Sequence, residues 1–374
     1  MLYFDWSATT KPDEDILELH QRINKEYWYN SETLYHEGQK SNALYLKAKQ
    51  NIIDKLKLYH KEILFTSGAT EGNNTALYGY LNRYLNKGCH VITSIMEHAS
   101  VLNVFKDLEN RGLDVTYLKP TKDGIIDINE LKDSIKNNTI LISIMWVNNI
   151  IGSIQPIKEI IDIKKQYPKI KLHVDCVQGF SKIPNDFDFN DLDFMVLSSH
   201  KLGGIKGTGC LIFNDKIELS FLKGGHQQNS LRPGTLDLAG CVTTSKIIER
   251  NLLPKDYYDV LKKYQYLVNE LENLEHLVLI RSTNYYSPYI LNINFKYMHA
   301  ETVLHLLDER GIIVGTGSAC NSKSKDSEPT LNYILPYFGN NLNPINSIRI
   351  SLNKENTMED IKILIKNIKE IGLK

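Results

Sequence analysis

A lysine at the end of an apolar run is the first residue that could do covalent chemistry. Residues 194–197 are apolar, and Ser198, Ser199, His200 and Lys201 follow them before two glycines. This order is typical of a buried strand that opens into a pocket and holds a lysine on a tight turn. Burial disfavours the ammonium form, so such a lysine can act as an amine nucleophile at neutral pH. Taken alone, the same residues also fit a strand that ends in a solvated lysine.

A second polar group follows another apolar run, at Asp175. A carboxylate at the end of a buried strand is costly unless it pairs with a cation, such as a protonated ring nitrogen. Residues 66–74 read Thr-Ser-Gly-Ala-Thr-Glu-Gly-Asn-Asn and follow an expected strand. Small residues there let backbone N–H groups and the Thr70 hydroxyl approach a phosphate at a helix N-terminus, although an ordinary capped turn has the same composition.

Together, Lys201, Asp175 and this helix start predict pyridoxal phosphate (PLP) as a cofactor. The lysine would form a Schiff base with it, and the acid would keep the ring nitrogen protonated so that the ring accepts electrons. Each signal alone is weak. Their order at successive strand ends is much less expected by chance.

Three further residues could act beside such a cofactor. His98 opens an expected helix and could stack on a flat ring or shuttle a proton, although a lone histidine also serves as a cap. Cys320 lies in a small, polar, lysine-containing segment, 315–329, which suits a nucleophile that must move. Arg349 is a charge inside a strand pattern and suits a bidentate carboxylate clamp, or needs no role at a sheet edge.

The elements that would position these residues alternate along the chain. We expect strands at 63–66, 90–94, 115–118, 140–147, 172–174, 194–197 and 210–213, and helices at 40–58, 70–85, 99–110, 128–136 and 157–166. This order predicts a mostly parallel sheet covered on both faces, with the carboxyl ends of its strands along one ligand-binding edge.

The pattern changes near residues 251–255. Beyond them we expect a helix at 256–272, strands at 277–280 and 290–295, a helix at 300–310, a glycine-rich segment at 315–317, a strand at 347–352 and a helix from 358. The sequence thus predicts a large α/β domain at 12–253 and a smaller α+β domain at 254–374. The N-terminal arm, 1–11, is expected to pack on the smaller domain.

Composition excludes several classes of protein. The 374 residues carry a formal net charge of zero, so nothing favours nucleic acid or an anionic membrane as a partner. No apolar run approaches the roughly 18 residues of a membrane helix, and the N-terminus does not resemble a signal peptide. Five scattered cysteines without a Cys-x-x-Cys argue against a disulfide framework and an intrinsic metal site. We expect a soluble, cytoplasmic protein.

The motifs, in this order, resemble the cysteine desulfurases of the class V aminotransferase family, which are PLP-dependent enzymes of fold type I. The resemblance covers nearly the whole chain and is most specific at 67–74, 198–201, 231–235 and 317–320. It implies a large domain with a mostly parallel seven-stranded sheet, a smaller C-terminal domain and a homodimer. It also implies conversion of L-cysteine to L-alanine, with the sulfur passed to an enzyme cysteine as a persulfide for iron–sulfur cluster assembly or tRNA thiolation.

The resemblance also assigns roles to residues. Lys201 would hold PLP and later move the α-proton of the substrate, and Cys320 would attack the substrate sulfur. His98 is counted with Lys201 and Cys320 among the implied catalytic residues. The substrate carboxylate would bind Asn149 and Arg349, and Asn149 is also an implied cofactor ligand. The other implied cofactor ligands are His98, Asp175 and Gln178 at the ring, and Ala69, Thr70, Ser198, His200 and, from the other subunit, Thr235 at the phosphate. No intrinsic metal is implied, although Cys320 could ligate an iron–sulfur cluster in transfer.

The chain departs from the family pattern at Trp146, Ile150, Ser199 and Gly204, and none of these changes removes a group that the chemistry needs. Two alternatives stay open. One is another class V PLP enzyme, such as a selenocysteine lyase, an aminotransferase or a β-eliminating lyase. The other is a non-catalytic scaffold for sulfur transfer. The sequence does not name the sulfur acceptor, which could be an iron–sulfur scaffold protein or a tRNA-thiolation enzyme.

Overall fold

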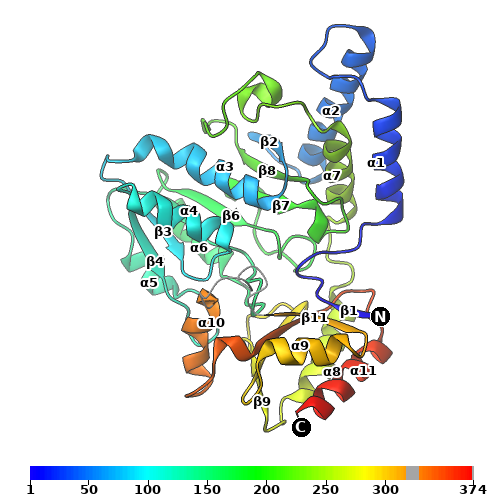
Figure 1. Ribbon diagram of the computed structural model, residues 1–374. Coiled ribbons are helices and arrows are strands. Elements are labelled where there is room, and N and C mark those ends of the chain that lie inside the picture. The colour runs from blue at the N-terminus through cyan, green and yellow to red at the C-terminus, as the bar shows by residue number, and fades with distance from the viewer. Residues whose placement is uncertain (317–327, 373–374) are drawn as a thin grey trace.

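The computed structural model describes residues 1–316 and 328–372 and contains two sheets (Figure 1). The larger sheet positions most of the candidate residues. Its seven strands lie in the order β2-β8-β7-β6-β5-β3-β4. They are β2 Lys61–Thr66, β3 His90–Ser94, β4 Asp114–Leu118, β5 Thr139–Ser143, β6 Lys171–Asp175, β7 Phe194–Ser198 and β8 Gly209–Asn214. Strand β8 runs antiparallel to both neighbours and the other pairs are parallel, so the predicted mostly parallel seven-stranded sheet is confirmed.

Helices cover both faces of this sheet, because neighbouring strand residues point to opposite faces. In β2, Ile63 belongs to one apolar cluster and Leu64 to another, and Ile142 and Leu141 of β5 divide in the same way. The clusters are completed by helices α1 Glu14–Glu26, α2 His36–Lys55, α6 Ile157–Lys165 and α7 Leu238–Arg250 on one side and α3 Ala69–Leu81 and α4 Ala99–Asn110 on the other. Burial on both faces explains why the strands are continuous apolar runs.

The second sheet joins the two ends of the chain. Its strands lie in the order β1-β11-β12-β10-β9, with bounds β1 Leu2–Phe4, β9 Leu277–Ile280, β10 Ile290–Phe295, β11 Ile312–Thr316 and β12 Ser347–Ser351. Strand β1 is parallel to β11, and α8 Tyr257–Leu271, α9 Ala300–Asp308 and α11 Met358–Ile371 lie around this sheet (Figure 1). The proposed division at residues 253 and 254 stays a prediction.

Some expected elements differ from those in the structure. The sequence analysis missed β1, α1, α7, the short helix α10 Pro329–Ile334 and strand β11, whose end it treated as a glycine-rich segment. Gly315 lies within this strand, and no side chain fits there, because a Cβ would stand 2.5 Å from Asp5 Oδ1 and 3.0 Å from Arg349 Nη2. The glycine therefore serves a close approach rather than a turn. Strand β5 also ends at Ser143, four residues earlier than expected.

Among the described residues, no helix combines the length and the apolar content that crossing a bilayer requires.

Candidate active site

A cavity of about 640 Å³ lies where the parallel strands of the first sheet end. It is lined by Ala69, Thr70, His98, Asn149, Asp175, Gln178, Ser198, His200, Lys201 and Arg349. Parallel strands joined by crossover helices present their carboxyl ends at one edge, so residues far apart in sequence meet there. Of the other predicted site residues, Thr235 does not line this cavity and Cys320 lies outside the described residues.

Lys201 lies on a 3₁₀ turn, Ser199–Lys201, directly after β7. Its Nζ donates hydrogen bonds to the carbonyl oxygens of Ser7 and Ala8, each at 2.6 Å. The N-terminal arm therefore holds the lysine at the cavity. Ser199, where the family has glycine, is buried and its Oγ lies 2.8 Å from Thr244 Oγ1 of α7. This contact ties the lysine turn to the helix behind it and explains the departure.

Asp175 ends β6 and is only 6% exposed. Its Oδ2 accepts a hydrogen bond from Asn73 Nδ2 at 2.9 Å, and its Oδ1 accepts one from Val177 N at 3.0 Å. No ion pair reaches this carboxylate within residues 1–316 and 328–372. A buried carboxylate that has hydrogen bonds but no cation fits a protonated ring nitrogen in the cavity.

His98 caps the N-terminus of α4, because its Nδ1 accepts a hydrogen bond from Ser100 N at 3.1 Å. That bond assigns the ring proton to Nε2. Burial lowers the pKa of His98, and Lys201 and Arg349 lower it further, against the opposing effect of Asp175. His98 is thus a neutral, flat ring that caps α4 and lines the cavity.

Asn73 is a residue that the sequence analysis did not assign. It is fully buried in α3, and its Nδ2 donates to Ser100 Oγ as well as to Asp175, both at 2.9 Å. Ser100 Oγ in turn lies 2.8 Å from His98 Nδ1. Asn73 therefore fixes the acid and the histidine relative to each other. Its signal in the sequence was a polar residue on the apolar face of a helix.

The other end of the cavity suits an anion. Gly68 precedes α3 with φ 141°, a conformation that side chains disfavour, and the first N–H groups of α3 have no partner inside the helix. The positive end of the helix dipole favours a phosphate there. Burial, followed by the charges of Lys201 and Lys206, lowers the pKa of His200 to about 4. His200 is therefore a neutral hydrogen-bonding group in the cavity as described.

The loop that contains Thr235 is fastened to this anion-binding turn. The Gln228 amide pairs with both backbone groups of Phe65, at 2.8 and 2.9 Å. Arg232 Nε donates to Glu71 Oε1 at 2.8 Å, and Glu71 Oε2 accepts from Ser67 N at 2.7 Å. Gln228 and the next two residues have φ values of 47°, 58° and 62°, a strained run for residues other than glycine. These contacts hold the strained loop against the turn.

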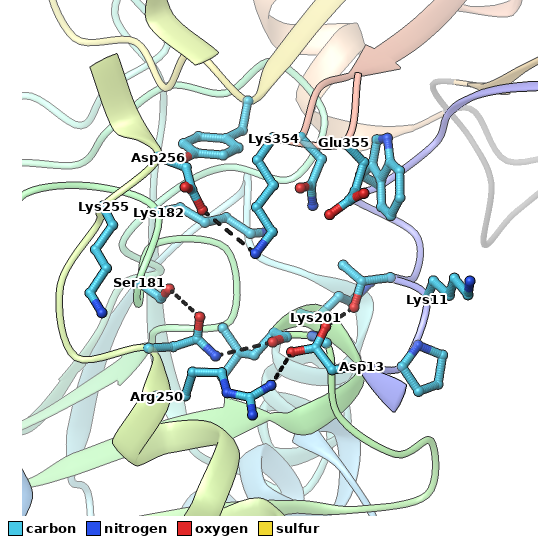
Figure 2. Close-up of a pocket in the computed structure, with 18 of the residues that line it drawn as sticks. Lys11, Asp13, Ser181, Lys182, Lys201, Arg250, Lys255, Asp256, Lys354 and Glu355 are labelled. Atoms are coloured by element: carbon cyan, nitrogen blue, oxygen red, sulfur yellow. Dashed lines mark hydrogen bonds and ion pairs between the residues drawn. The ribbon is translucent and has the colours of Figure 1, made fainter. Parts of the chain in front are cut away.

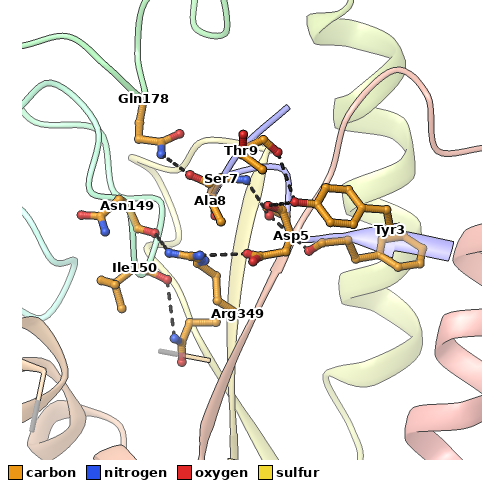
Figure 3. A network of polar contacts seen from close by, with 12 residues as sticks. Tyr3, Asp5, Ser7, Ala8, Thr9, Asn149, Ile150, Gln178 and Arg349 are labelled. Atoms are coloured by element: carbon orange, nitrogen blue, oxygen red, sulfur yellow. Dashed lines mark hydrogen bonds and ion pairs between the residues drawn. The ribbon is translucent and has the colours of Figure 1, made fainter. Parts of the chain in front are cut away.

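Polar residues also meet at Arg349 of β12, which lines the same cavity (Figure 3). Arg349 is 3% exposed, and it donates from Nη1 to Asn149 O at 3.0 Å and from Nη2 to Asp5 Oδ1 at 2.9 Å. Its Nε is buried without a partner. An unpaired buried donor is costly, so a carboxylate in the cavity would complete this site.

Two departures from the family pattern are absorbed by packing. Trp146 is buried with its ring edge-on to Phe187, at a centroid distance of 4.9 Å. A Cβ on Gly179 would lie 2.4 Å from the Trp146 ring, so glycine is needed there. Ile150 packs in an apolar cluster with Ile280. Neither residue takes a group from the cavity.

The model of the class-V aminotransferase family matches residues 2–364. The chain belongs to this family. It is 35% identical to the "NifS/IcsS protein homolog" of Lactobacillus delbrueckii subsp. bulgaricus, over 99% of this chain and 97% of that protein. It is 34% identical to "Cysteine desulfurase IscS" of Dictyoglomus turgidum, over 99% of this chain and 94% of that protein.

Solved structures of class-V relatives agree with this assignment. A NifS-like protein superposes with a TM-score of 0.88 at 29% identity, covering 99% of this chain and 98% of its own. SspA in complex with cysteine superposes with a TM-score of 0.81 at 31% identity, covering 94% of this chain and 99% of its own. The predicted resemblance to cysteine desulfurases and the predicted fold type are therefore confirmed.

Proposed function

We propose that this protein is a PLP-dependent L-cysteine desulfurase. The observation that carries the proposal is one cavity lined by Lys201, by the buried and cation-free carboxylate of Asp175, and by Arg349 with an unpaired Nε. The names of relatives at 34–35% identity over nearly the full chain support it. The reaction converts L-cysteine and the Cys320 thiol to L-alanine and a Cys320 persulfide, so one sulfur atom moves and no other reactant is consumed.

The residues present fit PLP. The helix start at Ala69 and Thr70, with Ser198 and His200, would hold its phosphate. Its ring would lie at His98, Asp175 and Gln178, within reach of Lys201. When bound, PLP supplies an electron-accepting ring that makes bonds at the α and β carbons of the substrate breakable.

The side chains of the chain would then divide the work. Lys201 Nζ would carry the proton that leaves the substrate Cα, because this primary amine lines the same cavity as Asp175 and directly follows β7. Arg349 would fix the substrate carboxylate through its open Nε. Asp175 would keep a negative charge where a ring cation needs one, and the neutral ring of His98 would exclude water.

Sulfur transfer is proposed for Cys320 from its position in the sequence. The preceding strand, β11, ends at Thr316, and its Gly315 is the register partner of Arg349. Cys320 is the fourth residue after Thr316. Four residues span at most about 14 Å, so the thiol can reach a substrate bound at Arg349. The smaller sheet would thus supply both the carboxylate clamp and the sulfur acceptor.

The test is alanine and sulfide production from L-cysteine with dithiothreitol by the PLP-loaded protein. We expect equal amounts of both products from the wild type and from Cys89→Ala, a matched control for loss of a partly exposed thiol. Cys320→Ala should bind PLP, with its visible absorption intact, and lose sulfide release. Undiminished sulfide release by the PLP-bound Cys320→Ala variant contradicts the role of Cys320. Turnover of selenocysteine but not cysteine would favour a lyase instead.

The proposal extends to a cytoplasmic homodimer that passes sulfur to an acceptor protein, either an iron–sulfur scaffold protein or a tRNA-thiolation enzyme. Thr235 does not line the cavity of its own chain, which supports a role for it in the cavity of a second copy. Sedimentation at micromolar concentration would measure the dimer. Persulfide transfer to proteins captured from native extract would identify the acceptor.

A further inference from the structure

A second lysine, Lys182, contacts the candidate active site from a neighbouring cavity. Lys182 follows β6 and lines a second cavity, of about 490 Å³, that also contacts Lys201 (Figure 2). Its Nζ donates a hydrogen bond to Gln178 Oε1 at 2.8 Å. Gln178 lines the candidate active site, so this amide connects Lys182 to that site. No ion pair joins Lys182 to a carboxylate in the part of the chain that the structure describes.

The two hydrogen bonds of Gln178 fix the direction of its amide. An ammonium group can only donate, so Oε1 points to Lys182. The Ser7 carbonyl can only accept, and Gln178 Nε2 donates to it at 2.9 Å (Figure 3). The same Nε2 carries a second hydrogen, and the buried Gln178 side chain lines the cavity. With Oε1 turned to Lys182, the second hydrogen of Nε2 is available as a donor to the cavity.

We propose that Lys182 is a positioning residue that holds Gln178 as a hydrogen-bond donor to the ring oxygen of PLP. This inference rests on the proposed function. The anionic ring oxygen needs such a donor most when it no longer shares a proton with the lysine nitrogen. Donation from Gln178 thus lowers the pH at which that shared proton is lost. Lys182 acts through the amide rather than on the cofactor itself.

Other charged groups near Lys182 influence its pKa and the charge of the second cavity. Burial, followed by the charges of Lys201 and Arg349, lowers the pKa of Lys182 to about 7. Above that pH Lys182 loses its charge, but the hydrogen bond to the Ser7 carbonyl still constrains the Gln178 amide. The charged side chains that line the second cavity with Lys182 are Lys11, Asp13, Glu14, Lys201, Arg250, Lys255, Asp256, Lys354 and Glu355. Lys255 is exposed, which makes it a matched control for loss of one charge from this cavity.

The test is a pH titration of the visible absorption band of the PLP-loaded protein. Lys182→Met should raise the midpoint by up to about one pH unit, the worth of a hydrogen bond to a charged group, because the Ser7 carbonyl still holds the amide in part. Lys182→Arg, which keeps a donor, should restore the wild-type midpoint, and Lys255→Met should leave it unchanged. If Lys182→Met does not fold, Lys182→Gln provides a neutral donor and should also keep the wild-type midpoint.

A double-mutant cycle separates positioning from bare charge. If Lys182 acts through the amide, adding Lys182→Met to a Gln178→Leu background should shift the midpoint no further. A wild-type protein that takes up no PLP overturns the proposed function together with this inference. An equal shift in both backgrounds, or an unshifted midpoint in Lys182→Met, overturns the inference alone.

Discussion

The two ends of the cavity are built in different ways. At the phosphate end, the groups come from the first sheet, and the supporting side chains bind one another, as Arg232 and Glu71 do. The N–H groups at the start of α3 stay open to a ligand. At the substrate end, the N-terminal arm and the second sheet meet, and the charged groups already have protein partners: Arg349 binds Asp5, and Lys201 binds the arm.

This difference separates affinity for the cofactor from affinity for the substrate. A site whose donors are open and fixed loses little entropy when it binds its ligand. A site whose charges already have protein partners offers the substrate fewer open donors, such as the Nε of Arg349. Substitutions at the phosphate end should therefore change the dissociation constant of PLP, and substitutions at the substrate end should change the KM for cysteine.

Asp175→Ala should have the largest effect, because Asp175 lies between the two ends and serves the ring. Removal of this buried charge should lower kcat roughly 100-fold or more, as for other electrostatic groups in active sites. Steady-state alanine formation measures this, and the absorption spectrum reports ring protonation. Asp175→Glu keeps the charge and should lose less. Equal losses in both variants would contradict an electrostatic role.

Arg349→Gln should raise the KM for cysteine about 10- to 100-fold, since a charge-assisted hydrogen bond to the carboxylate is lost. The dissociation constant of PLP should stay within about twofold of the wild-type value. Kinetics with varied cysteine and a PLP titration measure the two quantities. Arg349→Lys keeps the charge without the planar fork and should fall between the two proteins. Equal changes in the KM for cysteine and in the dissociation constant of PLP would contradict the proposed difference between the two ends of the cavity.

Arg232→Gln should weaken PLP binding roughly 3- to 10-fold and leave the KM for cysteine unchanged. The expected size is that of one partly buried hydrogen-bonded ion pair. The matched control is Arg83→Gln, because Arg83 pairs with Glu218, whose side chain is 88% exposed. Reconstitution of the apoprotein followed by absorbance measures both. A higher KM for cysteine without weaker PLP binding would contradict the assignment of Arg232 to the phosphate end of the cavity.

Glu97→Gln tests a different quantity, the dependence of folding stability on pH. Glu97 is buried behind the strand ends; burial raises its pKa to about 8, above its ordinary 4.5, and Oε2 has no partner. The folded state thus binds the extra proton between these pH values. The unfolding free energy of the wild type should fall relative to the variant by up to about 1.4 kcal/mol per pH unit between pH 4.5 and about 8.

Denaturant unfolding of the apoprotein at pH 5, 6, 7 and 8 measures this difference. Glu218→Gln, which alters a largely exposed carboxylate, is the control and should show no such trend. A difference between wild type and Glu97→Gln that is constant with pH would mean that Glu97 keeps its charge in the folded state.

The cavity was predictable from the sequence because reactive residue types stand at the ends of apolar runs. Asp175 and Lys201 follow strands, and parallel topology brings such ends to one edge. Contacts that support the cavity had no local signal. Gln228 and Phe65 are 163 positions apart, and Arg232 and Glu71 are 161 apart. Their pairing depends on how the loop folds back on the sheet, which periodicity does not report.

The missed elements have related causes. Helix α7, Leu238–Arg250, is rich in threonine and serine, and Thr243 and Thr244 are buried in it, so burial overrides its weak helix propensity. Strand β1 is three residues long and exists as a strand only through β11. Lys182 carries no local sequence signal, since its role depends on its contact with Gln178.

The pairing of the N-terminal arm with the second sheet sets an order for protein synthesis. Ser7 N binds Ser351 Oγ across 344 positions, and the same arm holds Lys201 through Ser7 O. The residues that leave the ribosome first must therefore wait for strands made nearly last. A nascent chain can fold its larger sheet early. The arm gains its contact with Ser351 only once β12 has been synthesised, so an incomplete chain holds the arm, and with it Lys201, by fewer contacts.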